Sequence, residues 1–569
     1  MENLSKAQKA RMAIRTFKIL ADSVSLQGHY QPFGKAGENL SEALKLFNPE
    51  IYGSMTNPRV VELKGLEYVI DRMPRGIERC NRIILTANEE FEGTSFEKVV
   101  PLKRRRLSYV VSDKEICFVI TRGQTEVYDI LAHITFLNIE AQKIQRQICN
   151  KEGGTCPEWH DLGRAASGEL ELSGEVLDQA IWNLSIILGR TYQETRESYH
   201  YIEDNRTRYH SNNSLFAIVY AMGERVIDEI KSIDQRLTVY FTPSLREMIG
   251  HHKYASNWAK GVKEAMYRQG MDKRPIHVIS ANMHSVKNVI YGAGALRAAG
   301  KKVPDNLYDM VEMIRKIKLD VDSYASEHGY YFHEDLSGSS IDVMLIDTAQ
   351  IDTSALHPSV TIDSGFIEQE QSVIVVMDYA FGTQAFSIMD ELLCPCHYDE
   401  HVVSFRFESV SIMGKAGILP GERGDIMLAT AHVMEGTPHN YIVNNDLGVD
   451  DFDESVDVYV GPMVTVLGTS LQNRDVLERF HHSSWKAVGL EMEGGHYQRA
   501  INAAIIQGHI LPNVKTRYAY YASDNPLRPD QTLAAGSMGR EGIIPTYMVT
   551  RVLVEKILNP VPVSKCTYE

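Results

Sequence analysis

The stretch Gly489–His496, GLEMEGGH, lies between a short apolar segment, Trp485–Val488, and a run with helical periodicity, Gln498–Ile506. Two carboxylates flank a methionine there, ahead of two glycines. One interpretation is a solvated helix start, because acidic side chains near a helix N-terminus interact favourably with its macrodipole. The other is a ligand site at which these carboxylates face a bound molecule. The stretch alone leaves both interpretations open.

The surrounding sequence alternates short β-rich runs with helical stretches from the turn-rich segment HEDLSGSSID onward. The β-rich runs are Val343–Ile346, Val373–Met377, Val402–Phe407, Asp425–Ala429, Val458–Val460 and Arg517–Ala522. This alternation predicts an α/β domain over residues 339–569, with a mixed, largely parallel central sheet flanked by helices. Ligands bind such sheets beyond the carboxyl ends of the strands.

Residues 1–338 have mostly helical periodicity. Apolar residues recur at three- and four-residue steps in Ser173–Arg190, behind a candidate Ser173 cap, and again in Leu307–Ile317 behind Asp305. Two strand-like runs, Ile116–Thr121 and Ile276–Ser280, interrupt the helices. We therefore expect a mainly α-helical domain with a small β component, which regulates the protein or joins it into a homo-oligomer.

Composition excludes several classes of protein. At 569 residues the chain is long enough for two or three domains. Acidic residues outnumber basic ones, 74 to 59, which disfavours a general nucleic-acid-binding surface. We interpret the one compact basic run, Lys103–Arg106, as a solvated face.

Cysteine usage and hydropathy indicate a reduced, cytoplasmic protein. The seven cysteines have no metal-ligand spacing, and the closest pair, Cys394-Pro-Cys396, lacks a second pair to complete a tetrahedral site, so we expect no metal and no cofactor. The N-terminus lacks the apolar segment of a signal peptide. No run reaches the ~18 apolar residues of a spanning helix, and we expect no membrane contact.

Several predicted strands end in glycine or acidic residues. VVMDYAFGTQAF ends a strand at Asp378 and turns at Gly382 into a helix, where backbone amides can face an anion. In SIMGKAGILPGERGD, Gly414 and Gly417 bracket Lys415-Ala416, which indicates either a close approach to a ligand or a tight turn. The segment YYASDNPLRP leaves a strand on Ser523-Asp524, and an aspartate there is usually a turn former or a cap.

The order of these segments resembles the nucleoside phosphorylase and nucleosidase superfamily. Gly-x-Ala-Gly, Gly-Asp, Gly-Pro-x-Val, Glu-Met-Glu-Gly and Ser-Asp follow one another in that superfamily as they do here, over Ile341–Leu558. Within it, SDNPLRPDQTLAAG and AFGTQAF resemble the AMP nucleosidases most. The resemblance implies cleavage of the N-glycosidic bond of a purine nucleotide or nucleoside, with AMP as the best single guess, in a homo-oligomer.

The resemblance also implies roles. Glycosidic cleavage builds positive charge on the ribose and negative charge on the departing base. Asp524 is implied as the general acid at the base, which requires a raised pKa, with Ser523 orienting it. Glu493 is implied to grip the ribose hydroxyls through charge-assisted hydrogen bonds. We expect substrate contacts from Gly382, Thr383, Gly414, Lys415, Ala416, Gly417, Glu491, Met492, Ser523, Asn525 and Arg528.

The sequence departs from the superfamily pattern at several positions, and these departures leave the phosphate-binding residues and the type of reaction open. Lys415 stands where relatives carry Ser, Thr, Cys or His, and either meets a substrate phosphate or points away; Arg528 and Arg540 are further phosphate candidates. Gly495 replaces a small alanine or serine. The arginine-bearing loop of many phosphorylases is missing, which favours hydrolysis, with Asp378 as a candidate water-activating base. Phosphorolysis with inorganic phosphate, or a non-catalytic nucleotide-binding sensor or assembly protein, are the alternatives.

Two polar clusters lie in the first half. His251, His252, His277 and His284 lack metal-ligand spacing and are interpreted as structural histidines. Arg190, Arg196, Arg206 and Arg208 belong to a stretch rich in Arg and Tyr, which fits either a phosphate-sensing or subunit-contact surface or a charged helix followed by a loop.

Overall fold

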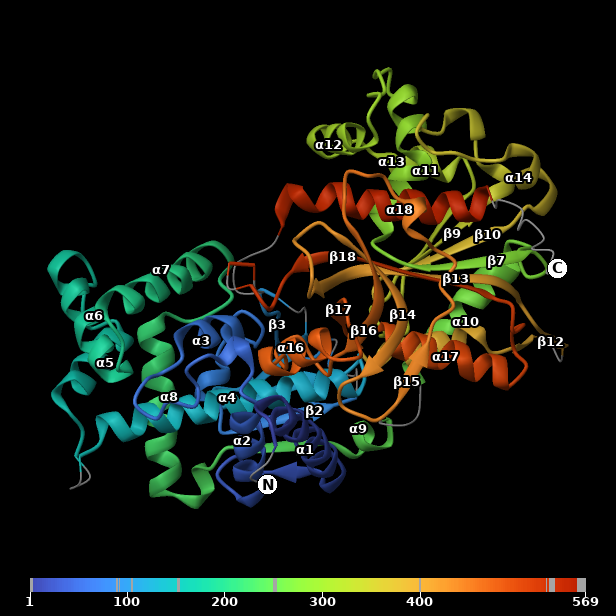
Figure 1. Cartoon of the computed structure of the whole chain (residues 1–569). Helices are drawn as coiled ribbons and strands as arrows, with labels where there is room; N and C mark the ends of the chain where they lie inside the picture. Colours follow the sequence, from blue (N-terminus) through green and yellow to red (C-terminus); the bar gives the residue numbers. More distant parts are fainter. Residues whose placement is uncertain are drawn as a thin grey trace. The chain divides into compact units, whose positions relative to one another are not determined.

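The computed structural model divides the chain into two compact units (Figure 1). Unit 1 comprises Met1–His251 and Leu467–Leu477, and unit 2 comprises His252–Val466 and Glu478–Glu569. The structure describes residues 4–87, 91, 93–103, 106–150, 154–248, 253–398, 401–528, 530–531 and 538–559. Across these residues, no helix has the length and apolar character that crossing a membrane requires.

Unit 1 contains a six-stranded sheet, which is a larger β component than the two strand-like runs predicted for the first half of the chain. Its strands are β1 (His29–Tyr30), β2 (Arg82–Thr86), β3 (Glu97–Val99), β4 (Leu107–Ser112), β5 (Glu115–Val119) and β6 (Thr238–Phe241), in the order β1-β6-β2-β5-β4-β3. Only β5 was predicted. β2 pairs in parallel with both β5 and β6, so strands distant in the sequence form the centre of the sheet.

Nine helices of unit 1 are described, and α4 is the most buried. They are α1 (Lys6–Gln27), α2 (Lys35–Phe47), α3 (Leu63–Ile70), α4 (Gln124–Ile148), α5 (Pro157–Ser167), α6 (Gly174–Leu188), α7 (Tyr192–Tyr209), α8 (Leu215–Lys231) and α9 (Pro243–Met248). α6 confirms the helix predicted over Ser173–Arg190, although the Ser173 side chain makes no capping hydrogen bond.

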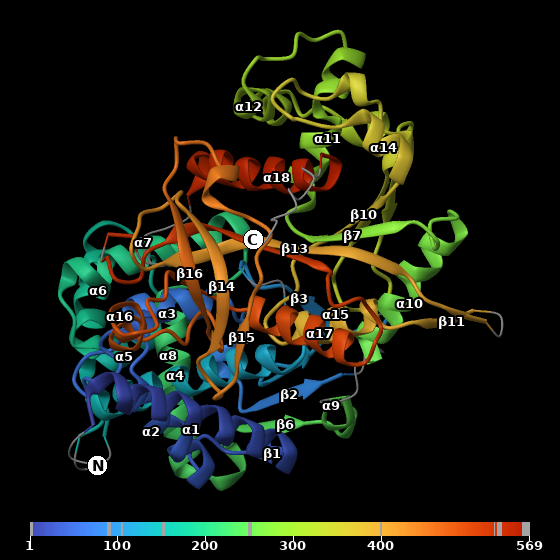
Figure 2. The ribbon, with the colours of Figure 1, turned by 45° about the vertical axis from the view of Figure 1, so that its right-hand side comes forward.

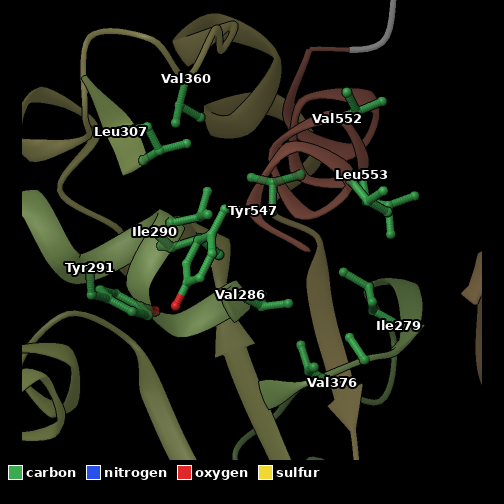
Figure 3. Packing of buried hydrophobic residues seen from close by; sticks show 14 of the residues in the cluster. Ile279, Val286, Ile290, Tyr291, Leu307, Val360, Val376, Tyr547, Val552 and Leu553 are labelled. Atoms are coloured by element: carbon green, nitrogen blue, oxygen red, sulfur yellow. The ribbon is translucent and has the colours of Figure 1, made fainter. Parts of the chain in front are cut away.

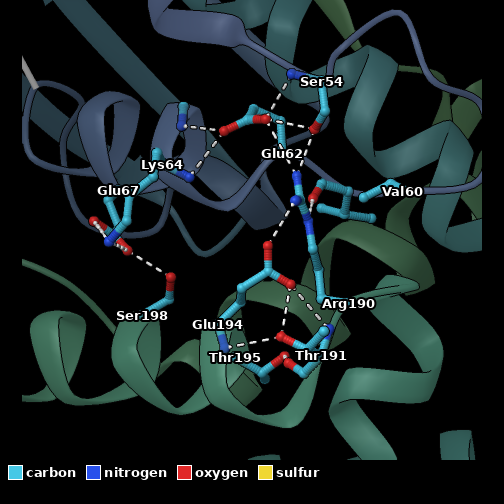
Figure 4. Close-up of polar contacts among 12 residues, drawn as sticks. Ser54, Val60, Glu62, Lys64, Glu67, Arg190, Thr191, Glu194, Thr195 and Ser198 are labelled. Atoms are coloured by element: carbon cyan, nitrogen blue, oxygen red, sulfur yellow. Dashed lines mark hydrogen bonds and ion pairs between the residues drawn. The ribbon is translucent and has the colours of Figure 1, made fainter. Parts of the chain in front are cut away.

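Two arginines of the Arg- and Tyr-rich stretch of unit 1 form ion pairs with glutamates. Figure 4 shows one of them, Arg190. Arg190 donates to Val61 O at 2.7 Å and pairs with Glu62 and Glu194, which joins the start of α3 to the start of α7. Arg206 pairs with Glu203 within α7. Both therefore serve the fold, as the charged-helix interpretation expects.

The basic run Lys103–Arg106 is not simply a solvated face, which corrects that expectation. Arg106 is buried and forms an ion pair with the buried Asp129, and Lys103 pairs with Asp71 at 2.7 Å. Arg104 and Arg105 lie outside the described residues. The sequence could not reveal this arrangement, because the partner carboxylates lie on other elements.

Unit 2 is built on a ten-stranded sheet, as far as the described residues show. Its strands are β7 (Pro275–Ser280), β8 (Tyr330–His333), β9 (Val343–Asp347), β10 (Val373–Met377), β13 (Arg406–Ile418), β14 (Ile426–Met434), β15 (Asn440–Ile442), β16 (Val458–Thr465), β17 (Gly489–Glu491) and β18 (Lys515–Asp524). The order is β15-β14-β16-β17-β13-β7-β10-β9-β8, and β18 pairs with β13 and β14. A small hairpin, β11 (Cys396–Tyr398) and β12 (His401–Val403), is separate.

The sheet confirms the predicted α/β architecture and shows how it is mixed. β7 is parallel to β10 and β13, and β13 is parallel to β18, whereas β17 runs antiparallel to β13. β7 was expected in the helical half, yet it lies between β10 and β13 in this sheet. The boundary expected after Gly338 therefore falls within unit 2.

Helices cover both faces of this sheet (Figures 1 and 2). They are α10 (Lys253–Arg268), α11 (Met283–Ala298), α12 (Leu307–Ile317), α13 (Val321–Ser326), α14 (Ser364–Glu370), α15 (Gln384–Leu393), α17 (Gly494–Ile506) and α18 (Ile543–Leu558). The sequence of α16 (Arg474–His482) includes the boundary between Leu477 of unit 1 and Glu478 of unit 2. On one face, Ile279 and Val376 pack against residues of α11 and α18 (Figure 3). On the other, Val278 and Val375 pack with α10, α15 and α17. Successive strand residues alternate between these two cores because β side chains alternate in direction.

Candidate functional site

The carboxyl ends of four neighbouring strands meet at one edge of the unit 2 sheet. β10, β7, β13 and β18 are consecutive parallel neighbours, so the segments after Ser280, Met377 and Ile418 and the end of β18 at Asp524 lie on this edge. The start of β17 pairs antiparallel with the end of β13. This is the position at which open α/β sheets bind ligands.

Gly417 links the two acidic segments singled out from the sequence. It pairs with Leu490 of β17 on one side and with Asp524 of β18 on the other. A Cβ added at Gly417 would lie 2.7 Å from Leu490 Cδ2 and 3.4 Å from Asp524 Oδ2. The absence of a side chain at Gly417 therefore lets Asp524 approach the strand that leads to Glu493.

Asp524 is a buried carboxyl group, one oxygen of which has no hydrogen-bond partner among the described residues. Ser523 Oγ donates to its Oδ1 at 2.7 Å, and within the described chain Oδ2 is buried without a hydrogen-bond partner. Burial raises the pKa of Asp524, although the Ser523 hydroxyl and the charge of Arg423 partly oppose this. The arrangement favours a protonated carboxyl group, which can donate from Oδ2.

Glu493 lies at the start of α17 and is held by the turn after β10. Its Oε1 accepts from the backbone N–H of Gly382 at 3.0 Å, and Gly382 has φ 55°, a conformation that favours glycine. At the same helix, Tyr497 Oη lies 3.0 Å from Ser280 Oγ at the end of β7. The ends of β7 and β10 are thus tied to the helix that carries Glu493.

Glu491 is held by internal hydrogen bonds, and its expected contact with a substrate stays a prediction. It is fully buried, and its Oε2 accepts from the backbone N–H groups of Glu493, at 2.6 Å, and Gly494. Its Oε1 accepts from Thr465 Oγ1 and lies 3.2 Å from His432 Nδ1. Burial alone would raise the pKa of Glu491, but His432, Thr465 and the Gly494 amide together bring it below its ordinary value. Glu491 is therefore an internal clamp on the start of α17.

The two glycines of GLEMEGGH allow close packing of the helix start. A Cβ at Gly494 would overlap His432 Cε1 and Tyr520 Oη. A Cβ at Gly495 would lie 2.5 Å from Met434 Sδ and 2.6 Å from Thr465 Oγ1. The start of α17 therefore packs closely against β14, β16 and β18, and this packing fixes the position of the Glu493 backbone.

Gly494→Ala is expected to lower the free energy of unfolding by about 3 kcal/mol, because the new methyl group overlaps two buried rings. Calorimetric unfolding measures the loss. Gly448→Ala is the matched control, since Gly448 has extended backbone and no atom within 4 Å of the added Cβ. Equal stability of the two variants would contradict the packing described here.

The GKAG motif is part of a strand, not a turn. Gly414, Lys415, Ala416 and Gly417 all lie inside β13, in register with β18. A Cβ at Gly414 would lie 3.7 Å from Tyr379 Cε1, an ordinary van der Waals contact, so the space at this position does not require glycine. Lys415 pairs with Tyr521 and has an exposed side chain.

The other residues predicted to contact the substrate or its phosphate have the following surroundings. Asn525 is buried, and its side chain donates to Gly421 O at 2.8 Å and accepts from Leu527 N, so it stabilises its own loop. Arg528 pairs with Glu422 at the surface, and its expected contact with a substrate stays a prediction. Thr383 is the N-cap residue of α15, and Met492 is buried between the two acids. Arg540 is exposed in the short helix Gly539–Gly542.

Lys415 lines a cationic cavity of about 620 Å³. The other charged or imidazole side chains that line it are His284, Lys287, Arg315, Lys318 and Asp322, from α11, α12 and α13 and the residues next to them. Lys287 pairs with Asp322 at 2.6 Å, which leaves a cationic excess. Asn282, which caps α11, and Tyr521 also line the cavity. Sequence reasoning missed Arg315 and Lys318, because no motif marks a helix end that folds against a distant strand.

The histidines of this region differ in role. Burial and nearby cations lower the pKa of His277 to about 3, and its Nδ1 lies 2.8 Å from Ser409 Oγ, so it is a neutral structural residue. His284 lines the cavity, whereas His251 and His252 lie outside the described residues. His432 carried no motif and was overlooked. Among the described residues, no cluster of three or more His, Cys, Asp or Glu side chains forms a metal site.

The chain belongs to a family described as "Family of unknown function (DUF6909)", which matches residues 38–303 and 310–559. No curated protein matches it. Among solved structures, it is similar to a futalosine hydrolase mutant of Helicobacter pylori, at 11% identity and a TM-score of 0.30 over 50% of this chain and 98% of that one.

Two further solved structures are similar over a comparable part of the chain. The 5′-methylthioadenosine/S-adenosyl homocysteine nucleosidase of Helicobacter pylori has 11% identity and a TM-score of 0.31 over 50% of this chain and 97% of that chain. Uridine phosphorylase from Schistosoma mansoni, in complex with uracil, has 14% identity and a TM-score of 0.30 over 53% of this chain and 91% of that one.

Proposed function

We propose that this protein cleaves the N-glycosidic bond of a purine riboside by hydrolysis. The observation that carries the proposal is Asp524, a buried carboxyl group with a raised pKa, which lies beside the strand that leads to Glu493. Among the described residues, its Oδ2 has no hydrogen-bond partner. The order of strand-end motifs supports the same chemistry. The arrangement supplies a proton donor for the base and an acceptor for the sugar.

Each acid has a distinct task in this mechanism. Asp524 holds a proton on Oδ2 and donates it to the purine as the glycosidic bond breaks, while Ser523 fixes Oδ1. Glu493, oriented by the Gly382 amide, accepts from ribose hydroxyls and stabilises the positive charge that develops on the sugar. The Glu491 clamp keeps Glu493 at the helix start.

Asp378 is our candidate for activating water. It follows β10 and is half-buried, and its Oδ1 accepts from Tyr379 N at 2.8 Å. Asp378 and Glu493 both raise the pKa of Tyr497 through their charges, although burial is the larger cause, so both lie near the same phenol. A base in this position can deprotonate a water molecule that attacks the sugar.

The cationic cavity favours a nucleotide, with AMP as the proposed substrate. Lys415 is the residue of the GKAG motif that lines it, and Arg315 and Lys318 add charge from the end of α12. Clustered Lys and Arg side chains bind phosphate groups through charge-assisted hydrogen bonds. We assign the substrate phosphate to this cavity rather than to Arg528.

Lys415→Met is expected to raise KM for AMP about 30-fold, a loss of roughly 2 kcal/mol, through one missing charge-assisted contact. KM for adenosine should change less than about twofold if Lys415 binds only the phosphate. Lys316→Met, an exposed lysine of α12 outside the cavity lining, is the matched control. Equal effects on AMP and adenosine would contradict the assignment to a phosphate.

The activity itself is tested by incubating the purified protein with AMP, other purine nucleotides and purine nucleosides, and following free base by chromatography. Release without inorganic phosphate, together with ribose 5-phosphate from AMP, supports hydrolysis. A strict requirement for phosphate, with formation of a sugar 1-phosphate, supports phosphorolysis instead. Tight nucleotide binding without free base under either condition supports a nucleotide sensor and ends the enzyme proposal.

A further inference from the structure

Four lysine and arginine side chains of unit 2 line the cavity that we assign to the substrate phosphate, as far as the described residues show. Three of them, Arg315, Lys318 and Lys415, are exposed and form no ion pair with any residue that the structure describes. The fourth, Lys287, is buried, and its ammonium group is already paired with Asp322. Asp322 is also the one carboxylate among the described lining residues. The cavity therefore contains an internal anion beside its most buried cation.

The pair between Lys287 and Asp322 has a closely defined geometry. Lys287 Nζ donates to both carboxylate oxygens of Asp322, at 2.7 Å and 2.6 Å. Tyr330 provides a second donor: burial, followed by the charge of Asp322 and the hydrogen bond to it, raises the pKa of the Tyr330 hydroxyl. The side chain of Asp322 is 55% exposed, whereas that of Lys287 is 11% exposed. Asp322 is thus held in place and still accessible to a molecule in the cavity.

The cavity has a sheet side and a helix side. Lys415 and Tyr521 line it from β13 and β18, whereas Lys287 and Asp322 line it from α11 and α13. The helix side is a group in which α11 contacts α12, α13 and α18 (Figure 1). A ligand that enters from the strand ends therefore meets Lys415 first and Asp322 further along.

The direction of a bound nucleotide follows from the proposed function, on which this inference rests. Glu493 and Asp524 hold the sugar and the base at the strand ends, and Lys415 holds the phosphate next to the sugar. A second and a third phosphate group then extend towards α11 and α13, where they approach Asp322. The Asp322 carboxylate repels each added negative charge, and Lys287, already neutralised, supplies no compensating attraction.

We propose that Asp322 is a specificity-determining residue, which limits the cavity to nucleoside monophosphates by neutralising Lys287 and repelling the additional charge of a diphosphate or triphosphate. Arg315 and Lys318 attract any anion, but the Asp322 carboxylate opposes this attraction more strongly for every phosphate group added. An ion pair that only joined α11 to α13 would contribute to stability without any preference among nucleotides.

Binding of AMP, ADP and ATP to the full-length protein tests the proposal. Every protein compared carries Asp524→Asn, so that bound nucleotide is not turned over, and dissociation constants are measured by isothermal titration calorimetry without divalent cations. Asp322→Asn frees the Lys287 ammonium group and is expected to tighten ATP binding about tenfold relative to AMP, with ADP between them, as the removal of one nearby unit charge allows. Added salt should reduce this shift, because the Asp322 side chain is half exposed.

Two further variants test the direction of the effect. Lys287→Met keeps the aliphatic part of the side chain but leaves Asp322 without its cation, so it should shift the preference about fivefold towards AMP. The protein with both substitutions should return close to the starting ratio. Asp309→Asn is the matched control, because Asp309 is an exposed aspartate of α12 outside the cavity lining. Melting temperatures verify that each variant is folded.

The outcomes separate this proposal from the proposed function. If the wild type releases base but Asp322→Asn leaves the AMP-to-ATP ratio unchanged, or shifts it in the same direction as Lys287→Met, the specificity role of Asp322 is overturned and the enzyme proposal is not. If the ratio shifts as expected while the wild type releases no base, the role of Asp322 stands and the enzyme proposal fails. Failure of every variant to bind any of the three nucleotides also overturns the role of Asp322.

Discussion

Asp524→Asn should nearly abolish release of free base, lowering kcat by about 10³-fold, because a neutral amide cannot donate the proton that a general acid supplies. KM should change little, since asparagine keeps the shape of the side chain and can still accept from Ser523. The measurement is the rate of base release from the best substrate under saturating conditions. A variant with more than about a tenth of wild-type kcat would exclude Asp524 as the general acid.

The unfolding temperature of Asp524→Asn shows whether its loss of activity is due to misfolding. Because burial raises the pKa of Asp524 above its unfolded value, the contribution of this group to stability is complete below the unfolded pKa and is lost as pH rises through the folded pKa. At neutral pH the buried group opposes folding if it ionises. Asp524→Asn should therefore unfold at the same temperature as the wild type or a higher one.

The same shift sets the pH dependence of activity. A general acid must be protonated, so wild-type kcat should fall as pH rises through the raised pKa of Asp524. Ser523→Ala removes a hydrogen bond that lowers this pKa, and the falling limb should then move to higher pH. A profile unchanged by Ser523→Ala would assign the limb to another group.

Glu493→Gln is expected to lower kcat by about 10²-fold, because the lost negative charge no longer stabilises the positively charged sugar. The substitution is conservative for the fold, since the glutamine oxygen still accepts from Gly382 N. Glu555→Gln is the control: Glu555 Oε1 likewise accepts one backbone N–H, from Thr361 at 2.8 Å, but lies on α18 outside the site. Steady-state kinetics of the two variants gives the comparison.

The result also distinguishes binding from catalysis. If Glu493 only bound the ribose in the ground state, its loss would appear in KM with kcat unchanged. If the protein were a nucleotide sensor, neither Glu493→Gln nor Asp524→Asn would change any turnover. Loss of kcat with either substitution, at unchanged melting temperature, would support the two roles assigned here.

The α/β architecture of unit 2 and its acidic strand ends were predictable from local pattern. Strands such as Val373–Met377 are continuous apolar runs bounded by turn residues, and such runs are typical of a buried parallel sheet. Asp524 and Glu493 were singled out by the resemblance to the nucleoside phosphorylase and nucleosidase superfamily, because strand position by itself favours a turn former or a cap. Burial of Asp524 then followed from packing that the strand pattern already implied.

The roles of neighbouring residues were not predictable in this way. Both Glu491 and Glu493 flank Met492 in the sequence, yet Glu491 is an internal clamp bonded to His432 and Thr465, whereas Glu493 accepts from Gly382 N. Gly494 has no marked role in the sequence, yet its lack of a side chain makes room for His432 and Tyr520. In both cases the deciding partners lie on β14, β16 and β18, which no local spacing could identify.

The amino-acid sequence by itself determined the short buried strands, the helices between them and the acidic residues at the strand ends, because these depend on periodicity within a few residues. Tertiary structure alone decided that β7 belongs to the unit 2 sheet, that Lys415 shares a cavity with the end of α12, and that the segment Leu467–Leu477 belongs to unit 1. The physical reason is that pairing, burial and charge compensation are set by partners far away in the chain, and only the folded backbone brings them together.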